Sequence, residues 1–201
     1  MCIRDRIIGS LILGLYFNWY AAGLSLLSLF IYSFVYTPLK KINSVAVLIG
    51  GIPGAFPCLI GWAAAYDGDT FNWTGGWILF AIQFIWQFPH FWAIAWVAHT
   101  DYTKAGFKLL PSQTGPTKFT ALQTIIWSLL MIPVGMLPYF VKMSGWVSFW
   151  ILVTANAVMV IQCVRLYMNM DVKSARRVMF SSYIYLPIVL LALLADKIAA
   201  L

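Results

Sequence analysis

The sequence contains no glutamate and few charged residues of any kind. Its 201 residues include six acidic ones, all Asp, and charged residues make up only 9% of the chain. Soluble domains carry about 25% charged residues. Hydrophobic residues account for 62% and aromatic residues for 17%. So little charge excludes a soluble globular domain, and the composition predicts an integral membrane protein.

Cysteine is also scarce. The three cysteines are Cys2, Cys58 and Cys163, and the last two lie inside apolar runs, which is typical of small buried side chains. No Cys and His residues have the spacing of a zinc site. The sequence therefore excludes a disulfide framework and a metal centre of the Cys/His kind.

Long apolar runs fill most of the chain, and runs of about 20 residues span a bilayer as helices. We predict an all-α fold, a polytopic transmembrane helix bundle with five full spans and one partial span, Ile7–Phe17. Pro38 is expected to end the apolar helix Ala21–Tyr36. The basic segment Asn169–Arg177 is expected to form a loop before the last span, Val178–Ala195.

The first six residues, MCIRDR, differ from the rest of the chain because they are dense in charge and an apolar run begins directly after them. They have neither the apolar region nor the cleavage site of a signal peptide. We expect residues 1–6 to be a non-native scar and residues 7–201 to form a single transmembrane domain.

Basic residues are distributed unevenly between the two sides that alternating spans define. One side has two, Lys142 and Lys197, and the other has nine. Because cytoplasmic loops carry an excess of Lys and Arg, the richer side is predicted to be cytoplasmic. Its nine residues are Lys40, Lys41, Lys104, Lys108, Lys118, Arg165, Lys173, Arg176 and Arg177.

A stripe of polar residues marks the central span, Gly76–Ala98. On a continuous helix Gln83, Gln87, His90 and Asp101 fall within roughly 60° of one another. A polar stripe on an apolar helix is expected to face a protein interior or a water-filled cavity. Lys104 and Lys108 follow Asp101, and a carboxylate beside lysines is suited to a metal-bound anion.

Two other patterns have ordinary structural interpretations. Asp67 and Asp69 form a D-x-D that is able to bind a cation, although D-G-D-T is also common turn chemistry. Gly50, Gly54 and Gly61 share one face of a span, and small faces allow helices to pack closely in membranes.

Four motifs occur in a characteristic order and spacing. They are YTPLKKIN (Tyr36–Asn43), GGIPGAFPCLIGWAA (Gly50–Ala64), WQFPHFWAIAW (Trp86–Trp96) and DYTKAGFKLLP (Asp101–Pro111). Together they resemble the haem-directed farnesyltransferases of the UbiA superfamily of intramembrane prenyltransferases. The resemblance covers almost the whole chain from about Ile7 onward.

This resemblance implies nine helices around a central cavity and transfer of a farnesyl group from farnesyl diphosphate to a vinyl group of haem b, giving haem O. It also implies two aspartate motifs that hold Mg2+ and the diphosphate. The second motif begins at Asp101, but no N-x-x-x-D-x-x-x-D occurs in the 201 residues. By the resemblance the first two helices are missing, and we expect this chain alone to be inactive. A smaller departure is Leu109, where the family commonly has Met.

Roles for individual residues follow from the resemblance together with the polar stripe and the aromatic side chains around it. Asp101 is the expected catalytic residue and Mg2+ ligand. His90 is the second catalytic candidate, through contact with haem or assistance to proton loss, and a hydrogen-bonded core histidine is the alternative. The expected diphosphate contacts are Tyr36, Lys40, Lys104 and Lys108, and the expected cavity residues are Gln83, Gln87, Trp86 and Phe91.

Two alternative functions remain open from the sequence. Sister enzymes acting on quinone or chlorophyll precursors usually have a second Asp four residues after the first, and Ala105 stands there, which favours haem. A transporter or passive scaffold would use the polar stripe as a pathway. The expected partners are farnesyl diphosphate, haem b, the lipid bilayer of a bacterial inner membrane and haem A synthase, without nucleic acid.

Overall fold

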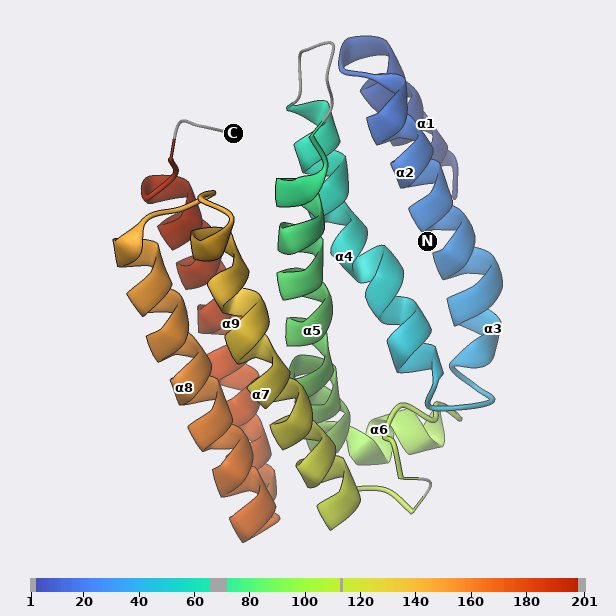
Figure 1. Cartoon of the computed structure of the whole chain (residues 1–201). Helices are drawn as coiled ribbons and strands as arrows, with labels where there is room; N and C mark the ends of the chain where they lie inside the picture. Colours follow the sequence, from blue (N-terminus) through green and yellow to red (C-terminus); the bar gives the residue numbers. More distant parts are fainter. Residues whose placement is uncertain (1–2, 66–71, 113, 199–201) are drawn as a thin grey trace.

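The chain forms a bundle of long helices in a computed structural model that describes residues 3–65, 72–112 and 114–198 (Figure 1). This confirms the all-α prediction. Asp67 and Asp69 lie outside the described residues. The elements are α1 (Ile3–Tyr16), α2 (Trp19–Phe30), the π-helical η1 (Ile31–Tyr36), α3 (Thr37–Leu39), α4 (Ala46–Ala64), α5 (Thr74–Val97), α6 (His99–Lys104), α7 (Lys118–Phe140), α8 (Trp146–Asn169) and α9 (Val172–Ala195).

Six helical stretches in the described residues are long and apolar enough to cross a membrane, one more than the five expected. The helix expected at Ala21–Tyr36 is the longer span Trp19–Leu39, because it continues past Tyr36 instead of ending at Pro38. In η1 the hydrogen bonding widens, and Thr37 N donates to Tyr32 O, five residues back. Pro38 then lies within the first residues of α3, directly after this widened turn, which is a common place for a helix to accommodate a proline.

The expected loop Asn169–Arg177 is wrong, because α9 already begins at Val172. Met170 adopts the left-handed conformation with φ 54° and ends α8. The Asp171 carboxylate accepts a hydrogen bond of 2.7 Å from Ser174 N and caps α9. An Asp at this position satisfies an unpaired N–H of the first turn, so the basic residues that follow remain helical and point outward.

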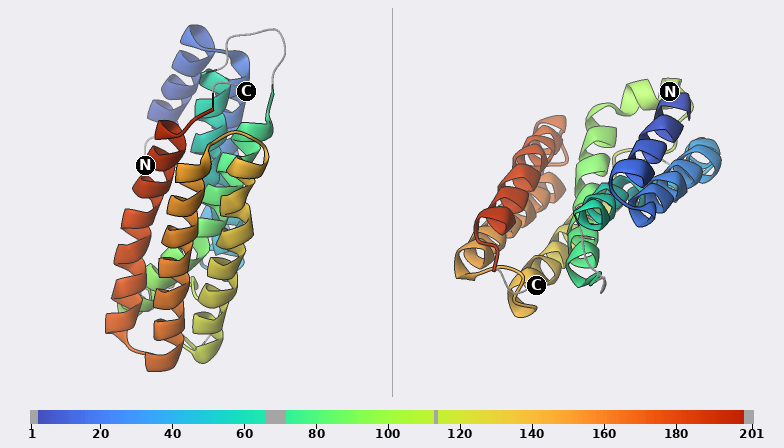
Figure 2. Two further views of the ribbon diagram at one scale, coloured as in Figure 1. Left: turned by 60° about the vertical axis from the view of Figure 1, so that its left-hand side comes forward. Right: turned by 90° about the horizontal axis from the view of Figure 1, so that it is seen from above.

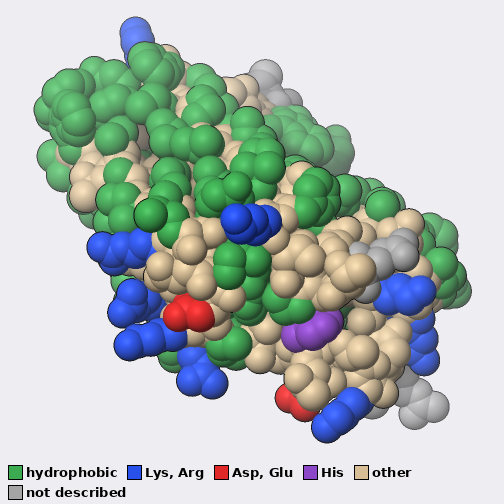
Figure 3. Space-filling model, turned by 90° about the horizontal axis from the view of Figure 1, so that it is seen from below, with side chains coloured by type: hydrophobic (Ala, Val, Ile, Leu, Met, Phe, Trp, Pro, Cys, Tyr) green, Lys and Arg blue, Asp and Glu red, His purple; other side chains and the backbone are tan. Residues whose placement is uncertain are grey.

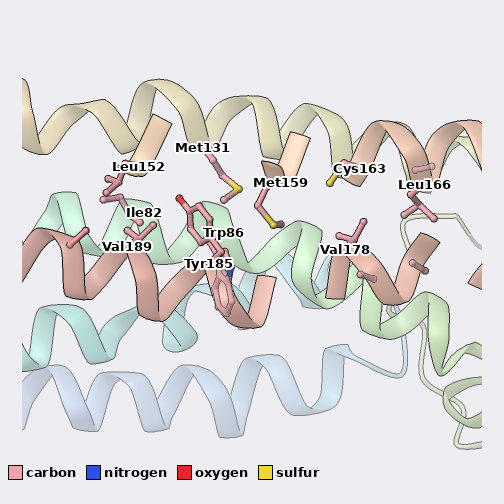
Figure 4. Packing of buried hydrophobic residues seen from close by; sticks show 14 of the residues in the cluster. Ile82, Trp86, Met131, Leu152, Met159, Cys163, Leu166, Val178, Tyr185 and Val189 are labelled. Carbon is pink, nitrogen blue, oxygen red and sulfur yellow. The ribbon is translucent and has the colours of Figure 1, made fainter. Parts of the chain in front are cut away.

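Helix α5 lies at the centre of the bundle. It packs against α4 on one side and against α7 and α9 on the other (Figure 2). The larger core lies among α5, α7, α8 and α9, where Met131 and Met159 approach the rings of Trp86 and Tyr185 (Figure 4). Flexible thioethers fill irregular gaps between aromatic rings, so this half of the bundle is well packed.

Candidate functional site

The nine basic residues of the richer side lie toward one end of the bundle. This end is formed by the connection from α3 to α4, by α6, and by the turn between α8 and α9. Figure 3 views this end and shows Lys and Arg side chains spread across it, with few acidic ones. Lys197 lies at the opposite end, where it forms a β-bridge with Ser144. The fold therefore gathers the cations as the sequence predicts.

Asp101 belongs to this basic end but not to the central helix. Helix α5 ends at Val97, and Ala98 leaves the helical conformation with φ −98° and ψ 22°. Asp101 lies in the first turn of α6, which crosses the lower end of the bundle (Figure 1). The expected continuous stripe from Gln83 to Asp101 is therefore wrong, because the constant angle per residue holds only within one helix. The Asp101 side chain is exposed.

Gln87 of the central helix is directed toward α4. Gln87 is 2% exposed, and its Nε2 donates to Gly51 O at 3.2 Å and to Gln83 O at 3.1 Å. Gly51 lies beside Pro53 in α4. The amide of Gln87 thus joins the two helices, and Gln83 is half-buried beside it.

His90 and Trp86 lie on the α9 side of the same helix. Their rings are stacked with centroids 4.6 Å apart. Trp86 Nε1 donates to Ser182 O at 3.1 Å, and His90 Nδ1 lies 2.7 Å from Ser182 Oγ. Ser182 Oγ donates its own hydrogen to Met179 O, so it accepts from His90 Nδ1–H. The Nε2 atom of His90 then keeps its lone pair.

An apolar cavity of about 480 Å³ lies between α2/η1, α4 and α5, near the basic end. Tyr32 and Tyr36 form one wall, Gly50 and Gly54 lie along α4, and Phe91 comes from α5. Of the expected cavity residues, Phe91 lines this space, and Gln83, Gln87 and Trp86 do not. Such a space, mostly apolar with a few hydroxyls, has the usual character of a small-molecule site.

The loop after α3 and the loop after α6 meet next to the apolar cavity. Lys108 N donates to Lys40 O at 3.0 Å. The Lys40 ammonium lies 5.7 Å from the ring centre of Tyr36 and 4.9 Å from that of Phe107, within the range of cation–π attraction. Tyr36 and Lys40, expected to act together, are thus neighbours.

A second, polar cavity of about 420 Å³ lies under the loop that follows α6. Its polar lining includes His99, Thr103 and Lys108, and it shares Tyr102 and Leu109 with the apolar cavity. Of the expected anion-binding residues, Lys108 lines this cavity. Asp101 and Lys104 are exposed and line neither one.

Sequence reasoning missed two residues of the apolar cavity, Ser28 and Tyr32. Together with Tyr36 they follow a spacing of four residues through an otherwise apolar run. Residues four apart lie on one helical face, so this periodicity was the available signal. Tyr102, to which the sequence assigned no role, is half-buried and lines both cavities.

The described residues include no group of three or more His, Cys, Asp or Glu side chains that could hold a metal ion. Within the described residues, α6 carries one carboxylate at the basic end, that of Asp101. Mg2+ is commonly held by one or two carboxylates together with phosphate oxygens of a substrate. A single exposed carboxylate such as that of Asp101 is not a metal site by itself, and it suits Mg2+ only together with phosphate oxygens of a bound substrate.

The apolar cavity lies next to the basic end of a transmembrane helix bundle. This arrangement is typical of membrane proteins that bind an anion with an apolar tail. The UbiA prenyltransferase family profile matches residues 7–186. This chain belongs to the UbiA prenyltransferase family, whose enzymes generally use a divalent metal for diphosphate binding.

Three relatives of this chain are named protoheme IX farnesyltransferase. The one from Cytophaga hutchinsonii is 49% identical over 96% of this chain and 66% of its own length. Those from Solibacter usitatus and Flavobacterium psychrophilum are 37% and 40% identical, over 90% and 85% of this chain and 61% and 57% of their own lengths. The chain thus spans less than two thirds of these relatives. No solved structure matches it.

Proposed function

We propose that this chain serves the transfer of a farnesyl group from farnesyl diphosphate to a vinyl group of haem b, giving haem O. The observation that carries the proposal is the identity of 49% over 96% of the chain to a protein with that activity in its name. The apolar cavity and the basic end beside it support the proposal. The cavity suits an isoprenoid chain, and the lysines of the basic end suit a diphosphate.

The reaction begins when the allylic C1–O bond breaks and the diphosphate leaves with the electron pair. Lys40 and Lys108, beside the mouth of the cavity, stabilise the leaving charge, and Tyr36 offers its hydroxyl; Lys104 adds a further cation at the rim. The rings of Tyr36 and Phe91 present π faces to the allylic cation. The vinyl group of haem b then attacks this cation, and water adds to the new cationic carbon next to the porphyrin and loses a proton, which gives the hydroxyethyl group of haem O.

Asp101 would hold Mg2+, which when bound neutralises charge on the diphosphate. His90 has a free lone pair on Nε2, and we assign it to the haem side of the reaction, either at the iron or at a proton that the adduct loses. Ser182 positions the ring through Nδ1. Haem A synthase is the expected consumer of the product.

A bacterial inner membrane is the proposed location, with the basic end in the cytoplasm. The nine-to-two distribution of Lys and Arg supports this orientation. Single cysteines at Lys41 and at Lys142 would test it: a membrane-impermeant maleimide added to intact cells should label only the second. Labelling of the first alone would reverse the proposed orientation.

The activity itself is tested by splicing this chain into the Cytophaga hutchinsonii relative in place of the matching residues. Membranes with the chimera receive farnesyl diphosphate, haem b and Mg2+, and mass spectrometry measures haem O. We expect haem O from the chimera and at least a roughly hundredfold loss in Asp101→Asn. Asp171→Asn, which changes the capping carboxylate of α9, is the control. Prenylation of a quinone precursor without haem O would contradict the proposal.

A further inference from the structure

The apolar cavity is elongated along the helices. On α2 and η1 it is lined by Ser28, Tyr32 and Tyr36, which are spaced by four residues. On α4 it is lined from Val47 to Pro57, and ten residues at 1.5 Å each correspond to about 15 Å of helix. The lining of the cavity, which we call the channel, therefore follows the helices from Tyr36 and Val47 near the basic end to Ser28 and Pro57 at the other, deep end.

The polar end of the channel lies at the basic end of the bundle. Tyr36 contacts the Lys40 ammonium there, and Tyr102 separates the channel from the polar cavity. The lining residues furthest from this end are Ser28 on α2 and Pro57 on α4. A diphosphate at the basic end would thus direct its isoprenoid chain toward Ser28.

The deep end is shaped by small groups and by a proline bend. Pro57 has no N–H, so it leaves the carbonyl of Pro53 without its helical donor. Ser28 Oγ donates to that oxygen at 3.4 Å. Beyond this point Asn18 Nδ2 donates to Ala63 O at 2.5 Å, and the neighbouring Ala21 and Ala22 are buried. Helices α2 and α4 are therefore joined past the deep end.

The channel length matches a chain of three isoprene units. An extended carbon chain advances about 1.2 Å per bond, so the twelve-carbon main chain of a farnesyl group is about 13 Å long. The eight-carbon main chain of a geranyl group is about 8 Å long, and the sixteen-carbon one of a geranylgeranyl group is about 18 Å long. Only the middle length fills about 15 Å without excess.

We propose that Ser28, opposite Pro57, sets the length of the isoprenoid chain that this protein accepts. This inference rests on the proposed function and adds a specificity-determining residue to it. A larger side chain at Ser28 would occupy the space of the third isoprene unit. It would leave the first two units and the anion-binding end unchanged.

The test uses the full 201-residue chain in lipid nanodiscs and three prenyl diphosphates with a photoreactive group in the last isoprene unit. We expect the farnesyl probe to label residues near Ser28 and Pro57, and the geranyl probe to label nearer Gly50. In Ser28→Leu, farnesyl labelling should fall about tenfold relative to geranyl labelling. Ser28→Val gives a milder change if the leucine variant does not fold.

Two control variants isolate the effect of volume. Ser28→Ala removes the hydrogen bond to Pro53 without filling the channel, and Ser33→Leu adds the same volume on a shallow outer surface. Both should keep the farnesyl preference. An unchanged preference in Ser28→Leu and Ser28→Val would overturn the assignment of Ser28 while the proposed function stands. Failure of every probe to label the channel in the wild-type chain would overturn both.

Discussion

The aromatic ring of Tyr36 lies directly against the backbone of Gly50. A Cβ at Gly50 would stand 2.7 Å from Cδ2 of the ring, closer than side chains pack. Because α4 has no side chain at this point, the ring of η1 rests on the α4 backbone and lines the apolar cavity. The position of Tyr36 at the cavity thus depends on a glycine of another helix.

Gly50→Ala should displace Tyr36 and impair the proposed reaction. Small misplacements at a reacting centre are costly, so we expect haem O formation by the chimera to fall roughly tenfold to a hundredfold. Gly61→Ala on the same helix is the matched control, since a Cβ there meets nothing within 4 Å. Equal activity of the two variants would show that Tyr36 has no role in the reaction.

The contact between His90 and Ser182 predicts separable effects on activity and stability. Ser182→Ala removes the acceptor of His90 Nδ1 and should cost about 1 kcal/mol of stability. His90→Ala should lower haem O formation at least tenfold, beyond what the loss of stability explains. Thermal unfolding in detergent and the activity of the chimera measure the two effects. Full activity in a folded His90→Ala variant would leave His90 as a core residue.

A buried hydrogen-bond chain joins α7, α8 and α9. Tyr185 OH donates to Asn156 Oδ1 at 2.7 Å, and Asn156 Nδ2 donates to Met131 O at 3.0 Å. Tyr185→Phe should lower the free energy of unfolding by about 1 kcal/mol, because it leaves a buried acceptor unpaired. Tyr183→Phe, at a partly exposed position nearby, is the control. No loss from Tyr185→Phe would mean that the chain adds nothing to stability.

The cap of α9 predicts a dependence of stability on pH. Hydrogen bonds from the Ser174 side chain and backbone hold the pKa of the Asp171 carboxyl below its ordinary value of 3.8. Because the pKa of this carboxyl is lower in the folded state than in the unfolded state, the ionised carboxylate stabilises the folded state when the pH is above the unfolded-state pKa. This stabilisation is lost as the pH falls through the folded-state pKa. Thermal unfolding between pH 6 and pH 2.5 measures it.

Asp171→Asn is the matched variant for this measurement, because asparagine also caps helices but does not titrate. We expect the wild-type chain to lose more stability between pH 4 and pH 2.5 than the variant. Parallel pH profiles would contradict a role for the Asp171 carboxylate. The rest of the chain is identical in the two proteins, so its contribution cancels in the comparison.

The sequence predicted which segments of the chain meet, but it did not predict the directions of individual side chains. The meeting of the Tyr36–Lys40 segment with the segment that begins at Asp101 was expected and is present in the contact between Lys108 N and Lys40 O. The shared direction of Gln87 and His90 was not predicted correctly. Although they lie close in angle, one bonds to α4 and the other to α9, because a central helix is surrounded by partners.

Composition and charge alone determined that this chain is a membrane helix bundle and which of its ends is basic. Both follow from the local sequence, because the hydrophobicity of a segment and the Lys and Arg residues beside it do not depend on contacts between helices. The tertiary structure decided where the cavities lie. The turn at Ala98 and the π-helical segment before Pro38 redirect the chain, and the close approach of Tyr36 to Gly50 is a contact between helices. A periodic pattern specifies the face of one helix, whereas a binding space is formed by the faces of several.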